Sequence, residues 1–517
     1  MTNVPGTETS TSASPTNPSS LRTKAKLVAG VFWTLLGTVG HRALGAVASI
    51  GIGRILGPAV FGQYAMVHST VNLFTAFAGF RLGSTSTKYI AEFREKDPAR
   101  AGRILGLVLV ATVGSCVLLS LVMLVMSPWL AANRLNKPEL TLPIAIGAGY
   151  LFLMMIGNVL LRTLAGFEEF RSIAIVGVVR GILSVLICIP MAYFFGLVGA
   201  VVALVVTSGV AAVQTLWMIR NAADKNKLIV PFKPKVIWKE WSILSSFALP
   251  AMLTGFVLVA TAWQGRAMLM QSANGDFELG VFSAADQLRL IVMFLPNAIG
   301  NVMLPMLSRS SGNEDQAEFD KTMLMNLMLA LRIALPAAMV GIAVSTILVF
   351  FFGEKYTDAV EVIPIVMLAV FVYSLNQACR QAFTATGKIW TNFWMHVIAA
   401  IIFIAACFFC IPRWGAIGFA YVHIISDSAL LVMQLAFASA FILQVSIRNL
   451  VLQFALGAIA ISAVIYIGWI FGPNVQAFAA AVAALLVAAP SIQLAWKTRQ
   501  ESRKANTNQK SSLSSIG

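Results

Sequence analysis

The chain has little of what soluble domains and reactive centres require. Only 11% of its 517 residues are charged, whereas a soluble domain is roughly 25% charged, and it holds five cysteines and four histidines. The sequence contains no Walker A, HExxH or GxSxG motif. We therefore expect no direct use of ATP, no metal or other cofactor, and no enzymatic activity.

What the sequence has instead is long, uninterrupted apolar runs. Hydrophobic residues make up 58% of the chain, and the mean hydropathy is +0.82. Runs of about 20 residues, each long enough to span a bilayer, recur from Leu27 to Trp496. Because these runs are continuous and do not alternate with polar residues, they predict membrane helices and not a barrel. The expected fold class is an all-α integral membrane protein.

The apolar runs predict about fourteen transmembrane helices. The two ends, 1–21 and a basic segment at 497–517, are polar and are predicted to be disordered tails. The helices are expected at 27–53, 62–87, 104–130, 142–161, 173–195, 198–219, 243–270, 279–307, 323–352, 360–379, 389–411, 416–441, 450–471 and 477–496.

Basic residues are distributed unevenly among the loops. If both termini face the cytoplasm, 26 of the 37 lysines and arginines lie in cytoplasmic segments and only five lie on the opposite side. Cytoplasmic loops of membrane proteins carry such an excess. The bias predicts cytoplasmic termini, and it explains the net charge of +16 without nucleic acid as a partner. The five on the opposite side are Arg54, Arg134, Lys137, Lys355 and Arg413.

Two short motifs recur at a nearly constant distance. FGQYA at 61–65 resembles LGVFS at 279–283, 218 positions later, and GLVGA at 196–200 resembles GAIGF at 415–419, 219 positions later. This spacing indicates a duplication. Because six helices separate the copies, the halves share one topology, related by an axis along the membrane normal. We predict an N-lobe at 22–220, a cytoplasmic linker at 221–240, a C-lobe at 241–441, and two further helices within 442–496.

Six arginines lie inside the predicted helices, where a permanent charge is costly. Arg42 and Arg289 are expected about 15 to 16 Å from the outer ends of their helices, at matching depth in the two lobes. They indicate either a cationic cavity that binds an anion or charge pairing within the bundle. Asp286 is the candidate partner, one turn from Arg289 and at a depth similar to that of Arg266. The six are Arg42, Arg81, Arg180, Arg266, Arg289 and Arg332.

Two acids, Asp286 and Asp427, also lie well inside the predicted helices. Each is a candidate site for a coupling proton or sodium ion. His423 precedes Asp427 by four residues and shares its helix face, so the pair is either a proton relay or a structural pairing. His68 and His396 are expected to be satisfied polar residues of the bundle.

Two stretches carry a resemblance to a known family. The first is RILGPAVFGQYA at 54–65, and the second is RLGSTSTKYIAEF at 81–93. They are similar to the R-x-L-G-P-x-x-F-G-x-Y and K/R-Y-I-A-E patterns of the polysaccharide transporter family. That family belongs to the multidrug/oligosaccharidyl-lipid/polysaccharide exporter superfamily.

The resemblance implies a flippase of the bacterial inner membrane that moves undecaprenyl-diphosphate-linked oligosaccharide by alternating access, for exopolysaccharide, O-antigen or capsule synthesis. The implied partners are the lipid-linked anionic oligosaccharide, membrane lipids, and a polysaccharide polymerase with its assembly proteins. Related lipid II flippases have a cationic cavity lined by the first, second, seventh and eighth helices. One arginine falls on each of those helices here: Arg42, Arg81, Arg266 and Arg289.

Other functions compete with this interpretation. Lipid II itself is an alternative substrate. An ion-coupled multidrug antiporter of the same superfamily is a second alternative, although cationic drugs favour buried acids and the deep arginines outnumber the deep acids six to two. A membrane-bound glycan polymerase or ligase is disfavoured because the longest loop on the outer side, at 131–141, is too short for a catalytic domain.

Overall fold

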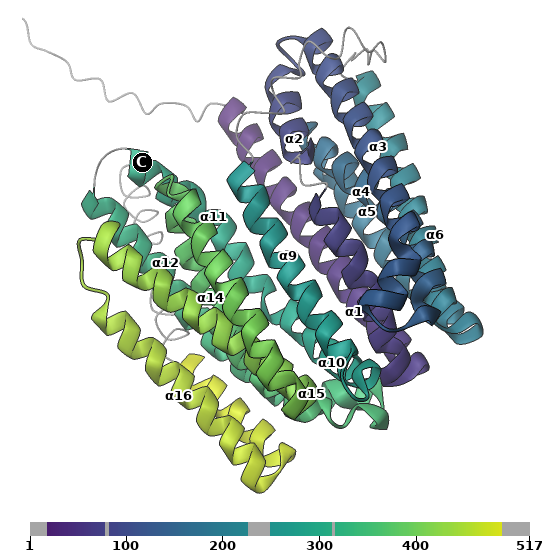
Figure 1. Ribbon diagram of the computed structural model, residues 1–517. Coiled ribbons are helices and arrows are strands. Elements are labelled where there is room, and N and C mark those ends of the chain that lie inside the picture. The colour runs from purple at the N-terminus through teal and green to yellow at the C-terminus, as the bar shows by residue number, and fades with distance from the viewer. Residues whose placement is uncertain (1–17, 78–81, 226–248, 313–315, 489–517) are drawn as a thin grey trace, which may run out of the picture.

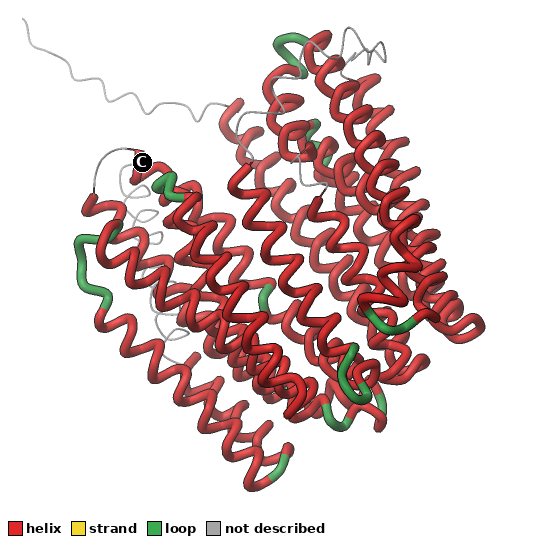
Figure 2. Tube along the Cα trace, viewed as in Figure 1, coloured by secondary structure: helices red, strands yellow, loops and turns green. Residues whose placement is uncertain are grey.

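The computed structural model describes residues 18–77, 82–225, 249–312 and 316–488 (Figure 2). These residues form helices joined by short turns, and no β-strand occurs among them. The all-α prediction is thereby confirmed. The helix α1 begins at Pro18, within the predicted N-terminal tail. The rest of that tail, residue Arg81, most of the predicted linker and the C-terminal tail lie outside the described residues.

The helices form two groups in space. In Figure 1, α2 to α6 gather on one side and α11 to α16 on the other, with α1 and α9 between them. The first group comprises α1 (Pro18–Phe77), α2 (Leu82–Phe93), α3 (Pro98–Trp129), α4 (Thr141–Gly166), α5 (Phe170–Leu183) and α6 (Ile189–Lys225). The second comprises α9 (Leu249–Met270), α10 (Gly275–Val292), α11 (Phe294–Gly312), α12 (Gln316–Ala343), α13 (Ser345–Phe352), α14 (Ala359–Ala385), α15 (Ile389–Phe441) and α16 (Arg448–Phe471).

The fourteen predicted helices can be found in this arrangement. Eight helices among the described residues are long and apolar enough to cross a membrane. Three of them contain a glycine with non-helical backbone angles where the chain turns, so each holds two predicted helices: Gly57 in α1, Gly196 in α6 and Gly415 in α15. The pair α10 and α11, the helix α9, and a short apolar helix at Pro473–Ala488 supply the other three.

The eighth predicted helix, at 279–307, is not continuous. It is divided into α10 and α11, which are bent by 43° relative to each other. Pro296 explains the break, because its ring lacks a backbone N–H and clashes with the carbonyl of the residue four positions earlier, Val292. The bend separates Arg289, near the end of α10, from the remainder of the predicted helix.

The duplication predicted from the motifs is visible in the backbone. Of the nine described residues with positive φ, eight form four pairs separated by 217 to 219 positions. Gly196 and Gly415, for example, have φ of 59° and 49° and are 219 positions apart. Since positive φ is strained for most side chains, its recurrence marks equivalent turns. The other three pairs are Gly57 with Asn274, Asn136 with Gly353, and Glu168 with Gly387.

The two halves meet through equivalent glycines. A Cβ atom added at Gly62 would lie 2.0 Å from the backbone oxygen of Asp276, and one added at Gly280 would lie 1.9 Å from that of Pro58. Gly280 follows Gly62 by 218 positions, and Asp276 follows Pro58 by the same number. The contact is therefore made twice, as a pseudo-twofold axis between the lobes requires. Only glycine allows the backbones to approach so closely.

Candidate functional site between and within the lobes

Polar contacts join the two lobes at one end of the bundle. The Arg54 guanidinium donates a hydrogen bond to the backbone oxygen of Phe351 (3.2 Å), and the Tyr356 hydroxyl donates one to that of Gly53 (2.9 Å). Lys137 and Asp276 form an ion pair of 2.6 Å. We call this the outer end, because the sequence predicts that it faces away from the cytoplasm.

Towards the other end, the contacts between the lobes are mainly aromatic. Trp263 of α9 still donates a hydrogen bond to Thr70 Oγ1 of α1 (3.0 Å). Further on, Phe77 packs against Phe256, with ring centroids 4.6 Å apart. The hydrogen bonds and the ion pair between the lobes are concentrated at the outer end, so the lobes are held together there.

Two of the predicted arginines share one carboxylate in the C-lobe. Asp286 of α10 forms an ion pair with Arg266 of α9 at 3.3 Å and a second with Arg289, one turn further along its own helix. Arg266 also donates a hydrogen bond to Ser69 of α1 (3.1 Å) and so links the cluster to the N-lobe. The Asp286 side chain is only 12% exposed. Two guanidinium groups thus share a single carboxylate within ion-pair distance.

A cavity of about 220 Å³ adjoins this cluster. The packing of α9, α10, α14 and α15 forms it, and the predicted residues Asp427 and His423 lie in its wall. The His423 ring packs against the rings of Phe282, Phe403 and Phe419, with centroids 5.0 to 5.7 Å apart. The polar residues that line the cavity are Arg266, Arg289, Tyr373, His396, His423, Ser426, Asp427 and Thr261.

Sequence reasoning missed His396 as a member of this cavity. We expected a satisfied residue, but both ring nitrogens are buried and have no hydrogen-bond partner, which corrects that expectation. His396 lies on α15 in the wall of the cavity, and no described residue there forms a hydrogen bond with its ring. His68, in contrast, is satisfied as expected, with its Nδ1 3.1 Å from the Asn72 amide.

Arg42 has surroundings different from those of the C-lobe arginines. Its guanidinium lies 5.1 Å from the centre of the Phe294 ring of α11, across the boundary between the lobes. The residue is exposed, and no ion pair joins it to a carboxylate in the described part of the chain. A cation over an aromatic face gains only partial compensation for its charge. Arg42 therefore remains available to an anion.

The remaining predicted arginines do not join these groups. Arg180 donates a hydrogen bond to Ser208 of α6 (3.4 Å), inside the N-lobe. Arg332 is exposed on α12. Arg81 lies outside the described residues. The structure thus brings together Arg266, Arg289, Asp286, Asp427 and His423, and places Arg42 apart from them at the lobe boundary.

The five cysteines are free and buried, and no group of three or more His, Cys, Asp or Glu side chains in the described ranges has a metal-binding arrangement. The site offers permanent positive charge and a small polar cavity inside apolar helices. Together with the duplicated lobes it defines the class of the protein: a multi-pass membrane transporter of two repeated lobes.

Comparison with known proteins gives the family. The family model described as polysaccharide biosynthesis protein matches residues 27–311, more than half of the chain, and the chain belongs to this family, within the multidrug/oligosaccharidyl-lipid/polysaccharide exporter superfamily. A second family model, MatE, matches residues 250–409. The resemblance stated from the two motifs is confirmed.

Curated relatives are similar at low identity. The EPS I polysaccharide export inner membrane protein EpsE of Ralstonia nicotianae is 25% identical over 41% of this chain, and the match spans 47% of EpsE, about half of its length. A putative O-antigen transporter of Shigella flexneri is 24% identical over 77% of this chain and 95% of its own length.

Solved structures share the fold. An inward closed lipid II flippase MurJ superposes with a TM-score of 0.66 at 13% identity, covering 90% of this chain and 99% of MurJ. An inward-facing multidrug resistance transporter of the MATE family gives 0.61 at 14% identity, covering 83% and 98%. At these identities the likeness concerns the fold alone.

Proposed function

We propose that the protein is a flippase that moves undecaprenyl-diphosphate-linked oligosaccharide repeat units across the inner membrane by alternating access, for exopolysaccharide, O-antigen or capsule synthesis. The observation that carries the proposal is Arg42, a permanent cation at the boundary between the lobes of a polysaccharide-family transporter. The names of the curated relatives, an exopolysaccharide export protein and a putative O-antigen transporter, support the substrate class.

Charge compensation gives Arg42 its proposed role. A diphosphate cannot enter hydrocarbon without a counter-charge, and a guanidinium binds phosphate oxygens through two parallel hydrogen bonds. Arg42 would supply the first contact, because its charge is not neutralised by a described carboxylate. Arg266 and Arg289, which share one carboxylate, would supply further positive charge, and Arg81 is proposed as a fourth cation. The lipid tail would remain in the bilayer while the lobes rock.

The C-lobe cavity is the proposed place for energy coupling. It brings Asp427 and His423 together beside the Asp286 cluster, within one polar space. Uptake of a proton or sodium ion there would change the charge facing Arg289 and bias the lobe arrangement. If Asp427→Asn transports as fast as wild type and keeps the same dependence on the ion gradient, coupling does not use this residue.

The test of the function uses a strain from which the gene is deleted. Lipid-linked repeat units should accumulate on the cytoplasmic face and disappear when the wild-type gene is restored. Arg42→Ala and Arg289→Ala, at normal protein level, should fail to clear them. Arg413→Ala is the matched control, because Arg413 is exposed at the outer end and bonds only to Phe409 of its own helix among the contacts described.

Each alternative predicts a different result in this strain. Accumulation of lipid II with arrested peptidoglycan synthesis would favour a lipid II flippase. Increased sensitivity to cationic compounds without any accumulated glycolipid would favour a multidrug antiporter. Full clearance by both arginine variants would mean that Arg42 and Arg289 are structural charges and not substrate ligands.

A further inference from the structure

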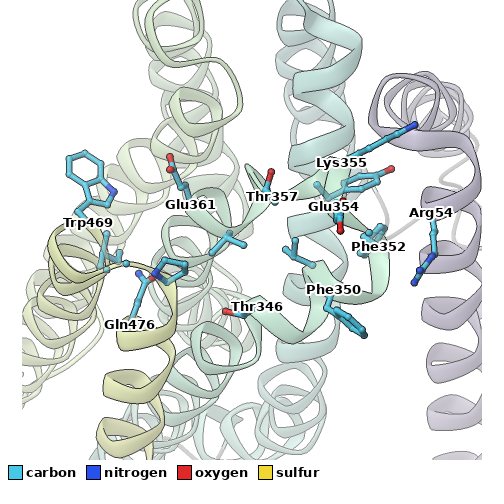
Figure 3. Close-up of a pocket in the computed structure, with 18 of the residues that line it drawn as sticks. Arg54, Thr346, Phe350, Phe352, Glu354, Lys355, Thr357, Glu361, Trp469 and Gln476 are labelled. Carbon is cyan, nitrogen blue, oxygen red and sulfur yellow. The ribbon is translucent and has the colours of Figure 1, made fainter.

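A second, larger cavity lies at the outer end, away from the arginine cluster. Its volume is about 1060 Å³, at the upper limit of the roughly 300–1,000 Å³ usual for ligand pockets. Three parts of the chain form it: the kink of α1, the segment from α13 to the start of α14, and the turn between α16 and the helix Pro473–Ala488 (Figure 3). None of the predicted cavity arginines lies in its wall, and neither Asp286 nor Asp427 does.

The wall contains one buried polar group without a partner and, close in the fold, a largely buried amide. The Thr346 hydroxyl oxygen is buried without a hydrogen bond. Gln476, whose residue is only 5% exposed, presents a side-chain amide in the same wall. Buried polar groups are normally paired, because leaving one unpaired costs about 1–3 kcal/mol. An unpaired hydroxyl and a side-chain amide in one cavity wall indicate a polar occupant.

The charges of the wall specify which kind of occupant fits. Arg54 and Lys355 are balanced by Glu354 and Glu361. A phosphate or anionic lipid headgroup requires an excess of positive charge, which this wall does not have. A neutral ligand that carries many hydroxyl groups requires donors and acceptors in similar number, and these four side chains provide both.

The cavity wall also contains an aromatic side chain. Trp469 lines the cavity at the end of α16, and the residue is 66% exposed (Figure 3). The flat indole offers an apolar face together with an N–H donor. A sugar ring has the matching chemistry, with an apolar C–H face and hydroxyl groups around its edge.

We propose that this cavity is a glycan-binding site at the outer end of the protein. The inference rests on the proposed function for the identity of the glycan, which would be the sugar portion of the exported polysaccharide. Trp469 stacks against a sugar ring, Gln476 and Thr346 bond to hydroxyl groups, and Glu361 accepts further hydrogen bonds. The site differs from the Arg42 region, which recognises diphosphate.

The site also joins the two lobes. Arg54 and Gly57 belong to α1, whereas the other lining residues belong to the C-terminal half, and the hydrogen bond from Arg54 to Phe351 joins the two halves beside the cavity. The bond from Tyr356 to Gly53 does the same. A ligand that contacts both walls binds only while the outer ends are together, so glycan on the outer side stabilises this arrangement.

Binding to purified protein in lipid nanodiscs tests the inference. The probe is short oligosaccharides prepared by partial hydrolysis of the host cell's own surface polysaccharide, which carry no lipid or diphosphate. Saturation-transfer NMR and titration calorimetry should detect binding to wild type. Trp469→Ala and Gln476→Leu should each weaken it by about tenfold. Leucine keeps most of the glutamine's volume, so a loss of affinity would come from the missing amide and not from a collapse of the cavity wall.

Trp414→Ala is the matched control, since Trp414 is 55% exposed in the turn within α15 and does not line the cavity. It should bind like wild type. No binding to wild type, or equal binding by Trp469→Ala and Gln476→Leu, would overturn the inference. Displacement of the oligosaccharide by glycerophosphoethanolamine would also overturn it, in favour of a lipid headgroup. The accumulation assay with Arg42→Ala reads the transport function separately, so the two proposals fail independently.

Discussion

The two lobes repeat one backbone but differ in how they hold charge. Their turns have positive φ at equivalent positions, and their inner helices meet through equivalent glycines. In the C-lobe, Arg266 and Arg289 share the carboxylate of Asp286. In the N-lobe, the described contacts of Arg42 are with the Phe294 ring and those of Arg180 include the Ser208 hydroxyl, with no carboxylate in an ion pair.

The comparison separates what builds the fold from what provides the site. Turn geometry and close helix contacts are fixed by steric exclusion, which is the same in both lobes. The charged side chains are not fixed by this backbone geometry, so they can differ between equivalent positions of the two lobes. In the C-lobe, Asp286 pairs with two arginines, whereas Arg42 of the N-lobe lies over an aromatic ring and forms no ion pair with a carboxylate in the described part of the chain.

The largest effect is expected from Asp286→Asn. The change leaves Arg266 and Arg289 without their shared counter-charge, and breaking a buried ion pair from one side costs about 3–5 kcal/mol. Thermal stability of the purified protein should fall sharply. Replacing Arg289 by glutamine in the same protein should recover part of the loss. Glu92→Gln, at an exposed position of α2, is the control and should leave stability unchanged.

The next effect concerns substrate affinity. Arg42→Ala should weaken binding of a lipid-linked diphosphate by about ten- to a hundredfold, because a charged hydrogen bond contributes about 1.5–3 kcal/mol. Arg180→Gln should change it little, and binding to both can be measured with purified protein. Equal losses for the two variants would mean that the N-lobe arginines act through the fold and not through the ligand.

Gly62→Ala and Gly280→Ala test the repeated contact itself. The added methyl groups would meet backbone oxygens at 2.0 Å and 1.9 Å, and overpacking costs about 1–3 kcal/mol. Spin-label distances across the outer end should lengthen by similar amounts in both. Gly114→Ala, where nothing lies within 4 Å, is the control. A shift in only one variant would show that the two contacts are not equivalent.

The smallest effect is expected from the ion pair between Lys137 and Asp276. The amide oxygen of an asparagine can still accept a hydrogen bond from Lys137, whose side chain is 30% exposed, so Asp276→Asn should shift the lobe arrangement by at most about 1 kcal/mol. Added salt should reduce the difference between variant and wild type. Exchanging the two residues should restore the wild-type distances, and a failure to do so would assign the effect to the Asp276 backbone contact with Gly62.

Much of the architecture was predictable from local features. The apolar runs predicted the helices, and the FGQYA and LGVFS motifs predicted the equivalence of Gly62 and Gly280 that the structure displays. The prediction failed where a local break was overlooked, at Pro296 between α10 and α11. His396 was misjudged because hydrogen bonding inside a bundle depends on neighbouring helices, which the sequence does not specify.

The sequence by itself determined that the chain is a duplicated bundle of membrane helices with deep arginines, since hydropathy and turn residues act over short stretches of chain. The pairing of Asp286 with Arg289, one helical turn away, also follows from local geometry. Only the tertiary structure decided that Arg266 joins the same carboxylate, that Arg42 lies over Phe294, and that Arg54 and Trp469 line one cavity. Those relations depend on how helices pack across the lobes, and packing is a property of the whole chain.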